Sequence, residues 1–397
     1  GALQPAKGAL PVAIRARKEK FKGLIVPKQN VREAAVVNDL EVYGMENIAE
    51  VIQFFSGQKT FEPTVINTRQ EFYEHQYQFD LDFADVKGQE NVKRALEVAA
   101  AGGHNLIMIG PPGAGKSMMA KRLPSILPPL SLAESLETTQ IHSVAGKLSK
   151  ETSLISQRPF RSPHHSISQV ALAGGGTNPQ PGEISLSHNG VLFLDEMAEF
   201  PRVKLDMLRQ PMEDKFIHIS RSKGTFSYPA DFQLVGALNP CPCGYYPDRN
   251  KCKCTSKEIK RYLGHISGPI LDRIDICVEA PRVDISDLSS KTKNLNESSE
   301  TIRKRVMAAR KKQEERFRGT NLKFNSEMTP NDIKKYCFLG NREQAYLENV
   351  FGVMELSARA YHKILRIART IADLEGSDRI EQIHLMEAVS YRMTDGK

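Results

Sequence analysis

The feature that most constrains this chain is a short apolar run at residues 106–109 that leads directly into the sequence GPPGAGKS. The spacing GxxxxGKS is that of a phosphate-binding loop, which joins a buried strand to the start of a helix. Its glycines let consecutive backbone N–H groups and the helix N-terminus surround phosphate oxygens. A glycine-rich turn without a ligand is the alternative, which the ordered strand, Lys-Ser pair and helical pattern MMAKRL disfavour. We therefore predict a nucleotide site formed by Gly110, Pro111, Pro112, Gly113, Ala114, Gly115, Lys116 and Ser117.

The second half of such a site should be another buried strand that ends in acidic residues, and residues 191–196, VLFLDE, fit that description. A continuous apolar run is typical of a parallel strand that is covered on both faces. We expect Ser117 and Asp195 to hold magnesium and Glu196 to polarise the attacking water. The expected chemistry is ATP hydrolysis by positioning and electrostatics. A strand that ends by chance in two surface acids is the alternative.

The chain has 397 residues, enough for two or three domains with their own cores. Its formal net charge of +8 favours an anionic partner such as nucleic acid, although many soluble proteins are equally basic. No apolar run approaches the ~18 residues of a membrane span, and no signal-peptide pattern opens the chain. We therefore expect no membrane association and a cytoplasmic location. The chain begins GALQPAK without methionine, so we expect further sequence upstream.

Composition and periodicity divide the chain into four regions. Residues 1–62 alternate two extended segments, 23–27 and 40–43, with helical patterns, which predicts a small α/β piece. Residues 63–82 are mixed polar and aromatic and are interpreted as a linker. Residues 83–290 alternate strands and helices, as a doubly wound parallel sheet requires. Residues 291–397 form an all-helical lid, with helical patterns at 300–317, 330–336, 343–351, 357–374 and 380–392.

The motifs together carry a family resemblance. The chain resembles an AAA+ ATPase in GPPGAGKS, VLFLDE, GALNPCPCG, LDRID and the helix LSARAYHKILRIARTIADL. It is similar to the ComM/YifB group of magnesium-chelatase-related AAA+ ATPases in RPFRSPHHSIS, PGEISLSHNGVLFLDE, LRQPMED and SGPILDRIDI. This resemblance covers essentially the whole chain. Residues 1–62 resemble the C-terminal part of the Lon-protease-like domain that precedes the ATPase in that family.

The resemblance implies roles for three further residues. Asn239 matches sensor 1, which orients the attacking water or touches the γ-phosphate. Arg273 matches the arginine finger that reaches a neighbouring subunit's nucleotide, and Arg359 matches sensor 2 on the lid. A guanidinium suits both tasks because it is always charged and presents a planar fork. An ion pair with Asp272 or Asp275 is the alternative for Arg273, and a solvated helix face is the alternative for Arg359. A finger that acts in trans requires a ring, which the family makes a homohexamer.

Four of the six cysteines are clustered in the sequence CPCGYYPDRNKCKC. In a cytosolic chain, clustered thiols argue for a bound metal rather than for disulfides. Four thiolates suit tetrahedral structural zinc, although the CxC spacing is tighter than the usual CxxC. Reduced or oxidation-prone thiols are the alternative. We predict a zinc site formed by Cys241, Cys243, Cys252 and Cys254.

Nucleic acid is expected to contact a β-hairpin at residues 216–234, whose two extended arms flank the sequence SKG. In related ring ATPases this insertion points into the pore, so Arg221 and Lys223 are candidate phosphate contacts. A solvated turn is the alternative. A second insertion, residues 158–183, is interpreted as a mobile loop, with His164 and His165 making polar contacts rather than binding metal. The basic run at residues 302–318 is interpreted as a solvated helix face or a nucleic-acid surface.

Two functions from different classes fit these observations. The resemblance implies an ATP-driven hexameric DNA motor, a helicase or branch-migration translocase that acts on single-stranded or branched DNA in homologous recombination and natural transformation. The alternative is an ATP-driven protein remodeller that resembles the magnesium-chelatase motor subunit or a Lon-type unfoldase. A nucleic-acid pore requires Arg and Lys, whereas a polypeptide pore usually offers aromatic side chains. Arg221 and Lys223 favour the first function, and Phe226 and Tyr228 keep the second open.

Overall fold

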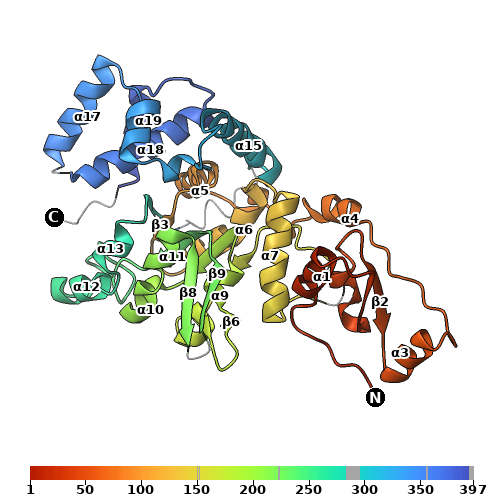
Figure 1. Ribbon diagram of the computed structural model, residues 1–397. Helices are drawn as coiled ribbons and strands as arrows, with labels where there is room; N and C mark the ends of the chain where they lie inside the picture. Colours follow the sequence, from red (N-terminus) through yellow and green to blue (C-terminus); the bar gives the residue numbers. More distant parts are fainter. Residues whose placement is uncertain (150, 152, 222–223, 283–295, 355, 393–397) are drawn as a thin grey trace.

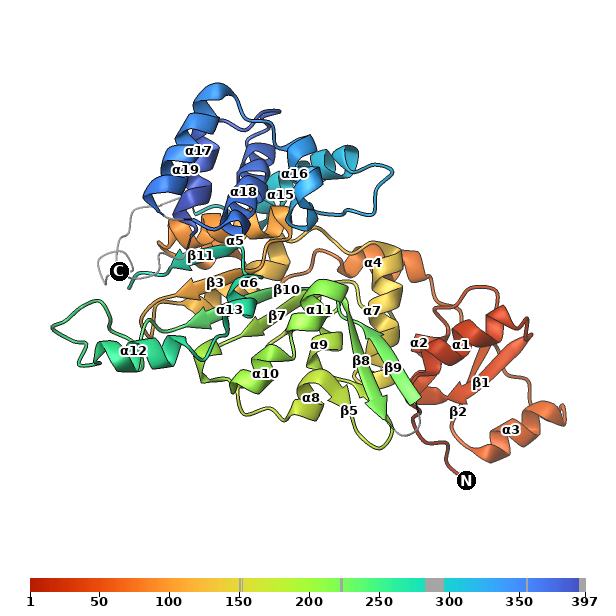
Figure 2. The same ribbon diagram turned by 60° about the vertical axis from the view of Figure 1, so that its left-hand side comes forward.

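The computed structural model describes residues 1–149, 151, 153–221, 224–282, 296–354 and 356–392, with only the backbone of residue 221. Three parts follow one another along the chain: a small N-terminal α/β part, a central α/β part and a C-terminal helical part (Figure 1). The helical part lies over one side of the central sheet, and the N-terminal part lies beside helix α7 (Figure 2). Among the described residues, no helix combines the length and the apolar character needed to cross a membrane.

A five-stranded sheet organises the central part. Every neighbouring pair of its strands is parallel. Their carboxyl ends therefore meet at one edge, where open α/β sheets bind their ligands. This arrangement confirms the predicted doubly wound α/β fold. The order of the strands is β11 (Ile276–Glu279), β3 (Leu106–Ile109), β10 (Phe232–Leu238), β7 (Gly190–Leu194) and β4 (Phe160–Arg161).

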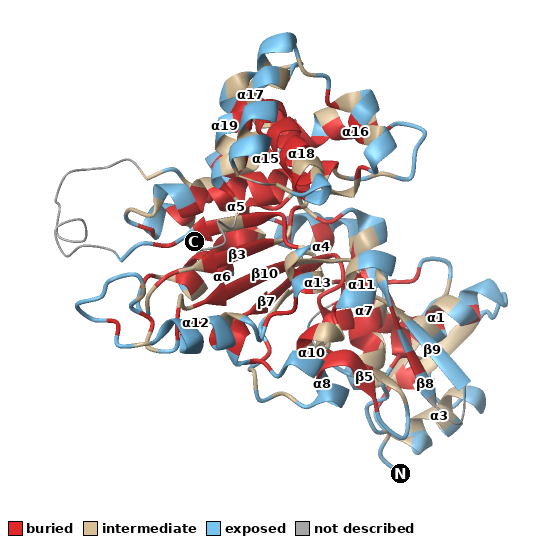
Figure 3. Ribbon diagram, turned by 90° about the vertical axis from the view of Figure 1, so that its left-hand side faces the viewer, coloured by how far each residue is buried: buried red, intermediate tan, exposed pale blue. Residues whose placement is uncertain are grey.

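Both faces of the sheet are buried, which explains why its strands read as continuous apolar runs. On β7, Val191 and Phe193 join the core shared with α5 (Glu90–Gly102) and α6 (Lys116–Ile126). Leu192 and Leu194, at the alternate positions, join a second core on the opposite face. Figure 3 shows the strands buried between the two layers. The helices of the second layer are α8 (Gln169–Ala173), α9 (Glu183–Leu186), α10 (Arg202–Asp206), α12 (Ser256–Leu263) and α13 (Gly268–Leu271).

The insertion interpreted as a mobile loop at residues 158–183 contains short regular elements between irregular segments. It begins with β4, the edge strand of the central sheet, and continues through α8 into a small antiparallel pair, β5 (Gly174–Gly175) and β6 (Gln180–Pro181). A strand of two residues has no periodicity that the sequence could reveal. Its place in the sheet fixes the segment that follows it.

The predicted hairpin is present. Helix α11 (Arg209–Asp214) leads into β8 (Phe216–Arg221), which pairs antiparallel with β9 (Gly224–Pro229). The hairpin projects away from the central sheet (Figure 2). The chain then returns to the sheet as β10.

The C-terminal part packs its longest apolar face onto the central part. Helix α18 (Ala358–Leu374) buries Ile364, Ala368 and Ile371 at the three- and four-residue spacing expected of a helix with one buried face. Helices α15 (Ser299–Arg316) and α18 both contact α5. The remaining helices are α16 (Pro330–Tyr336), α17 (Asn341–Val353) and α19 (Gln382–Ser390), close to the predicted boundaries.

The N-terminal part contains the two predicted extended segments as a parallel pair, β1 (Gly23–Pro27) and β2 (Glu41–Met45). Its helices are α1 (Ala9–Lys18), α2 (Val31–Ala34) and α3 (Ile48–Phe55). Helix α1 packs against α7 (Leu132–Ala145) of the central part. The segment interpreted as a linker contains helix α4 (Thr68–His75), which Asn67 caps and Phe72 anchors by burial.

Candidate active site

The phosphate loop lies at the carboxyl edge of the sheet, between β3 and α6. Its first residue, Gly110, donates its N–H to the carbonyl of Leu238 at 3.2 Å. A Cβ at position 110 would lie 2.2 Å from the carbonyl oxygen of Ala280, so only glycine fits there. Gly113 and Gly115 both have φ of +79°, which L side chains rarely adopt. The loop conformation therefore requires the glycines of the motif.

The loop forms one wall of a pocket of about 430 Å³. The acidic residues after β7 and the end of β10 form the rest of the wall. A pocket of this size at this edge suits a nucleotide's phosphates. The sequence-predicted residues that line it are Pro112, Gly113, Ala114, Gly115, Lys116, Ser117, Asp195, Glu196 and Asn239.

The Lys116 ammonium lies at the centre of this arrangement. It donates to the carbonyls of Gly110 at 2.6 Å and Pro111 at 3.0 Å, and to Asn239 Oδ1 at 3.2 Å. Burial lowers the pKa of Lys116, and the nearby carboxylates of Asp195 and Glu196 oppose that shift. The geometry brings the lysine and the predicted sensor asparagine into direct contact.

Ser117 and Asp195 provide two oxygen atoms for a hard cation. Ser117 Oγ donates to Asp195 Oδ2 at 2.5 Å, although the two residues lie on different elements. The other carboxylate oxygen of Asp195 accepts the backbone N–H of Glu196 at 3.0 Å, which holds the side chain in place. Hydroxyl and carboxylate oxygens beside a phosphate pocket are the donor set that Mg²⁺ takes, so these residues fit that ion.

Glu196 has an unusual backbone and a neighbour that the sequence interpretation missed. Its φ of +48° is left-handed, a strained conformation for a residue with a Cβ. His165 Nδ1 lies 3.6 Å from Glu196 Oε2. His165 follows β4, the strand beside β7, and its ring also contacts Phe200. The sequence showed only the adjacent pair His164–His165. It could not place this pair beside Glu196, because the strand before it has only two residues.

Neither predicted arginine lines the pocket. Arg273 donates to the carbonyl of Pro269 at 2.5 Å and pairs with Glu213. Arg359 pairs with Asp272. The ion-pair alternative for Arg273 therefore occurs, with Glu213 rather than with Asp272 or Asp275. Both guanidinium groups are held on the α13 side of the molecule, and the Arg359 side chain stays 77% exposed.

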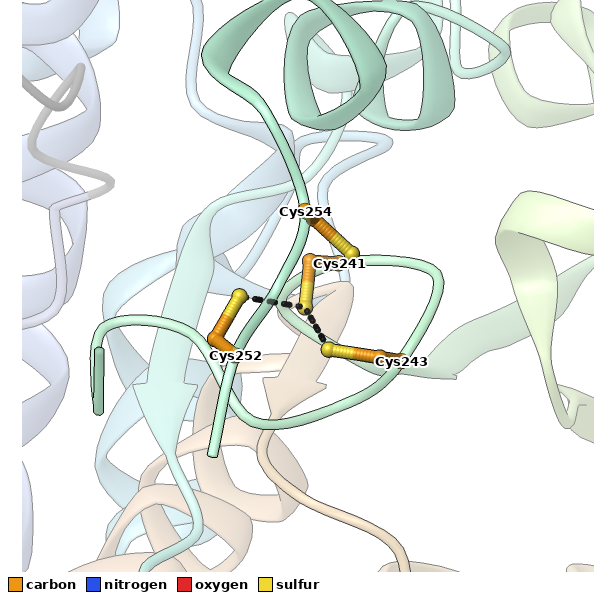
Figure 4. A group of neighbouring side chains, drawn as sticks. All are labelled: Cys241, Cys243, Cys252 and Cys254. Atoms are coloured by element: carbon orange, nitrogen blue, oxygen red, sulfur yellow. Dashed lines mark hydrogen bonds between the residues drawn. The ribbon is translucent and has the colours of Figure 1, made fainter. Parts of the chain in front are cut away.

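The four clustered cysteines converge at the end of β10 (Figure 4). Their sulfur atoms all lie within 4.8 Å of one another, with Cys241 Sγ 3.4 Å from Cys243 Sγ and 3.7 Å from Cys252 Sγ. Four sulfurs around a tetrahedral zinc ion with ~2.3 Å bonds lie roughly 3.8 Å apart, so the set fits that ion. A hydrogen bond from the backbone of Tyr245 lowers the pKa of the Cys243 thiol to about 6, whereas burial raises the pKa of the Cys252 thiol.

The cysteine cluster is also the one group of three or more His, Cys, Asp and Glu side chains with metal-binding proximity in the described part of the chain. The pair His164–His165 forms no such group. Cys277 and Cys337 lie apart from the cluster, and burial raises the pKa of each thiol to about 12.

One of the two predicted DNA contacts lies at the end of the first hairpin arm. Arg221 is the last residue of β8, where its backbone pairs with Gly224, and its side chain lies outside the described residues. Lys223 also lies outside them. On the described arms, Phe216 and Phe226 are exposed, and His218 bonds Ser227 across the strands.

A five-stranded parallel sheet with a phosphate loop after β3, an acidic pair after β7 and a polar residue after β10 defines an AAA+ nucleoside triphosphatase site. Comparison with known proteins agrees. Residues 82–288 match the family "Magnesium chelatase, subunit ChlI", and residues 296–392 match its C-terminal family.

Two similar relatives cover nearly the whole chain. Competence protein ComM of Haemophilus influenzae is 42% identical over 99% of this chain and 75% of its own length. YifB of Escherichia coli is 44% identical over 100% of this chain and 76% of its own length. Two more distant relatives match part of the chain. Lon protease 2 of Bacillus subtilis is 27% identical over 55% of this chain and 44% of its own length. The Holliday junction branch migration complex subunit RuvB of Pediococcus pentosaceus is 28% identical over 37% of this chain and 36% of its own length. The chain belongs to the ComM/YifB family of magnesium-chelatase-related AAA+ ATPases.

Proposed function

We propose that the protein is an ATP-driven DNA motor, a helicase or branch-migration translocase that acts in homologous recombination and natural transformation. The observation that carries this proposal is the pocket, which brings Lys116 together with Asp195, Glu196 and Asn239. The β8–β9 hairpin precedes β10, the strand after which Asn239 lies. The names of two relatives, a competence protein and a branch-migration subunit, support the DNA role.

Within the pocket each side chain has a task. Lys116 offsets the charge of the outer phosphates, and Ser117 and Asp195 hold magnesium. Bound magnesium supplies positive charge to the phosphate oxygens. Glu196 orients the attacking water and accepts its proton, and Asn239, in contact with Lys116, fixes the position of the γ-phosphate end.

The two arginines complete a neighbour's site in this proposal rather than their own. Arg359 pairs with Asp272, the residue next to Arg273 in the chain, so we place both arginines in one proposed subunit-contact patch. Neither group lines the pocket of the same chain. A head-to-tail interface that brings this patch to the next pocket closes into a ring, which supports a homohexamer.

The hairpin is the proposed DNA contact, through Arg221 and Lys223. Two exposed aromatic side chains on its arms, Phe216 and Phe226, suit base stacking as well as peptide contact. The alternative, a protein remodeller, rests on these aromatic residues and on the partial similarity to Lon protease 2. The basic tip favours DNA because phosphate charge must be offset.

The deciding experiment compares ATP turnover of the purified protein alone, with single-stranded DNA, with junction DNA and with an unfolded protein. The DNA motor predicts stimulation by DNA that declines as salt rises. Stimulation by unfolded protein alone would overturn it in favour of the remodeller.

The cysteine cluster is proposed to bind one structural zinc ion. Its sulfur spacing supports this assignment, and four protein ligands leave no open position for catalysis. Metal analysis of the purified protein should find about one zinc per chain, and a variant with all four cysteines changed to serine should contain none. Absence of stoichiometric metal from the unaltered protein would refute it.

The proposed domains are residues 1–62 as part of a Lon-protease-like domain, 63–82 as a linker, 83–290 as the AAA+ core and 291–397 as the lid. Matches at residues 82–288 and 296–392 support the last two boundaries.

A further inference from the structure

The cysteine cluster and the ATP pocket share one short piece of chain. Strand β10 ends at Leu238, and the next residue is Asn239, which contacts Lys116. Cys241 follows after a single proline. Cys241 is fully buried, and its sulfur accepts the backbone N–H of Tyr246 at 3.4 Å. Any movement of Cys241 is therefore transmitted over two residues to the asparagine in the pocket.

A second connection runs from the cluster to the phosphate loop. Gly244 follows Cys243 and donates its N–H to the carbonyl of Cys241 at 2.9 Å. A Cβ built on Gly244 would lie 2.5 Å from Pro112 Cδ and 2.9 Å from Pro112 Cγ. The backbone directly after Cys243 therefore lies against the proline ring of the phosphate loop. With φ of +83°, Gly244 also has a conformation that glycine accepts most readily.

The cluster itself is anchored on the far side. Cys241 and Cys252 form a small apolar core with Ile259, and Leu263 packs against it, both on α12. The segment that carries the cysteines therefore lies between α12 on one side and the phosphate loop on the other. The four cysteines form a large share of the apolar cluster of segment 240–254, so release of the sulfurs removes much of what joins this segment to α12.

We propose that the cysteine cluster is a positioning device for the ATP site: metal-closed thiolates hold Gly244 against Pro112 and Asn239 against Lys116, so that metal occupancy sets nucleotide affinity and turnover. This inference rests on the proposed metal site and deepens it, because it gives that site a task beyond local stability. Gly244 and Pro112 are positioning residues in this scheme, since they act through the phosphate loop.

The test distinguishes the effect of the contact between Gly244 and Pro112 from the effect of the bound metal. Gly244→Ala keeps all four cysteines but forces its methyl group against Pro112. Gly319→Ala is the matched control, because Gly319 has a similar φ of +80° with nothing within 4 Å of its Cβ position. The measurements on the full chain are zinc per chain, affinity for a fluorescent ATP analogue, and steady-state turnover.

Gly244→Ala should retain zinc, bind the analogue about tenfold more weakly and lose about ten- to a hundredfold in turnover, because small misplacements of reacting groups have effects of that size. Gly319→Ala should match the unaltered protein. In the double variant with Pro112→Ala, which removes the ring atoms that the methyl group meets, the effect of Gly244→Ala should shrink, which a general folding defect would not produce.

Chelation of the unaltered protein supplies a measurement without substitution. Removing zinc should weaken binding of the analogue, and adding zinc back should restore it. Unchanged affinity in both Gly244→Ala and the zinc-free protein would overturn the inference while leaving a structural zinc site intact. Finding no zinc at all would refute the metal proposal, and a persisting defect of Gly244→Ala would then assign the positioning role to the loop alone.

Discussion

Arg359 Nη1 donates a hydrogen bond to Asp272 Oδ2, which places the arginine of the helical part beside the loop that carries Arg273. Arg359 and Asp272 lie 87 residues apart in the chain. Lys363, one turn further along α18, donates to the carbonyls of Leu271 and Ile274 on either side of the same loop. Helix α18 therefore contacts the chain on both sides of Arg273.

This arrangement predicts that Arg273→Ala leaves nucleotide affinity nearly unchanged but lowers turnover by ~10³-fold, the lower end of the range for arginine fingers. Mixing it with Lys116→Ala, which should bind no nucleotide, should partly restore turnover, because intact pockets would then face intact arginines. Turnover is measured across mixing ratios, with each variant alone as control. Strictly additive activity in the mixtures would contradict action between subunits.

Glu196→Gln should bind ATP with unchanged affinity and lose at least about 10²-fold in turnover, because the amide cannot accept the proton of the attacking water. Glu199→Gln is the matched control: Glu199 is exposed on the short helix η3 (Met197–Glu199) that directly follows. Retained turnover in Glu196→Gln would remove Glu196 from the catalytic role.

Local motifs made the fold and most of the residues that line the pocket predictable. The run LIMI followed by GPPGAGKS specifies a strand, a loop and a helix from adjacent residues, and VLFLDE specifies a second strand in the same way. Each of these patterns depends only on residues that are neighbours in the chain, so the sequence alone is enough to predict the local structure. The helix pattern of α18 was equally readable because one apolar face repeats over its whole length.

Contacts between residues far apart in the chain were not predictable, because local patterns do not show which segments meet in the fold. The neighbour of Glu196 is His165, on a segment placed by the two-residue strand β4. Gly244 and Pro112 lie on two loops that are far apart in the chain, and nothing in either sequence predicts that they are in contact. The predicted alternatives for Arg273 named nearby acids, whereas the structure supplies Glu213 from α11. Such pairings depend on strand order, which becomes known only with the fold.

Substituting alanine for both Arg221 and Lys223 should weaken DNA binding and reduce the slope of log affinity against log salt by about 2, roughly 1 for each lost phosphate contact. ATP turnover without DNA should stay unchanged, because the hairpin lies outside the pocket. Lys334→Ala combined with Arg342→Ala is the control for loss of two positive charges, because both side chains are exposed on the C-terminal helical part. An unchanged salt slope in the double variant would remove the hairpin tip as a DNA contact.

Lys363 predicts a specific pH dependence of stability. Burial lowers the pKa of Lys363 to about 8 from an unfolded value near 10.5. Between these two values the unfolded chain binds more protons than the folded chain, so this lysine makes the free energy of unfolding rise with pH, by at most about 1.4 kcal/mol per unit. Urea unfolding of the unaltered protein and of Lys363→Met is compared from pH 7.5 to 9.5. The difference between them should shift in favour of the unaltered protein as pH rises, and a constant difference would contradict the assignment.

The contact between His165 and Glu196 predicts a separation of binding from turnover. His165 Nδ1 lies 3.6 Å from the Glu196 carboxylate, and a ring contact with Phe200 and the hydrogen bond from Lys204 to the His165 carbonyl fix its position. Because Glu196 carries a strained backbone, its side chain depends on such a neighbour for orientation. His165→Ala should therefore lower turnover by about tenfold, in line with a modest misplacement of the base, and leave nucleotide affinity unchanged. His164→Ala is the comparison variant: His164 is exposed and bonds Ser166, and its ring centroid lies 4.0 Å from that of His165. Equal loss of turnover in both variants would point to a general disturbance of the segment after β4 rather than to positioning of Glu196.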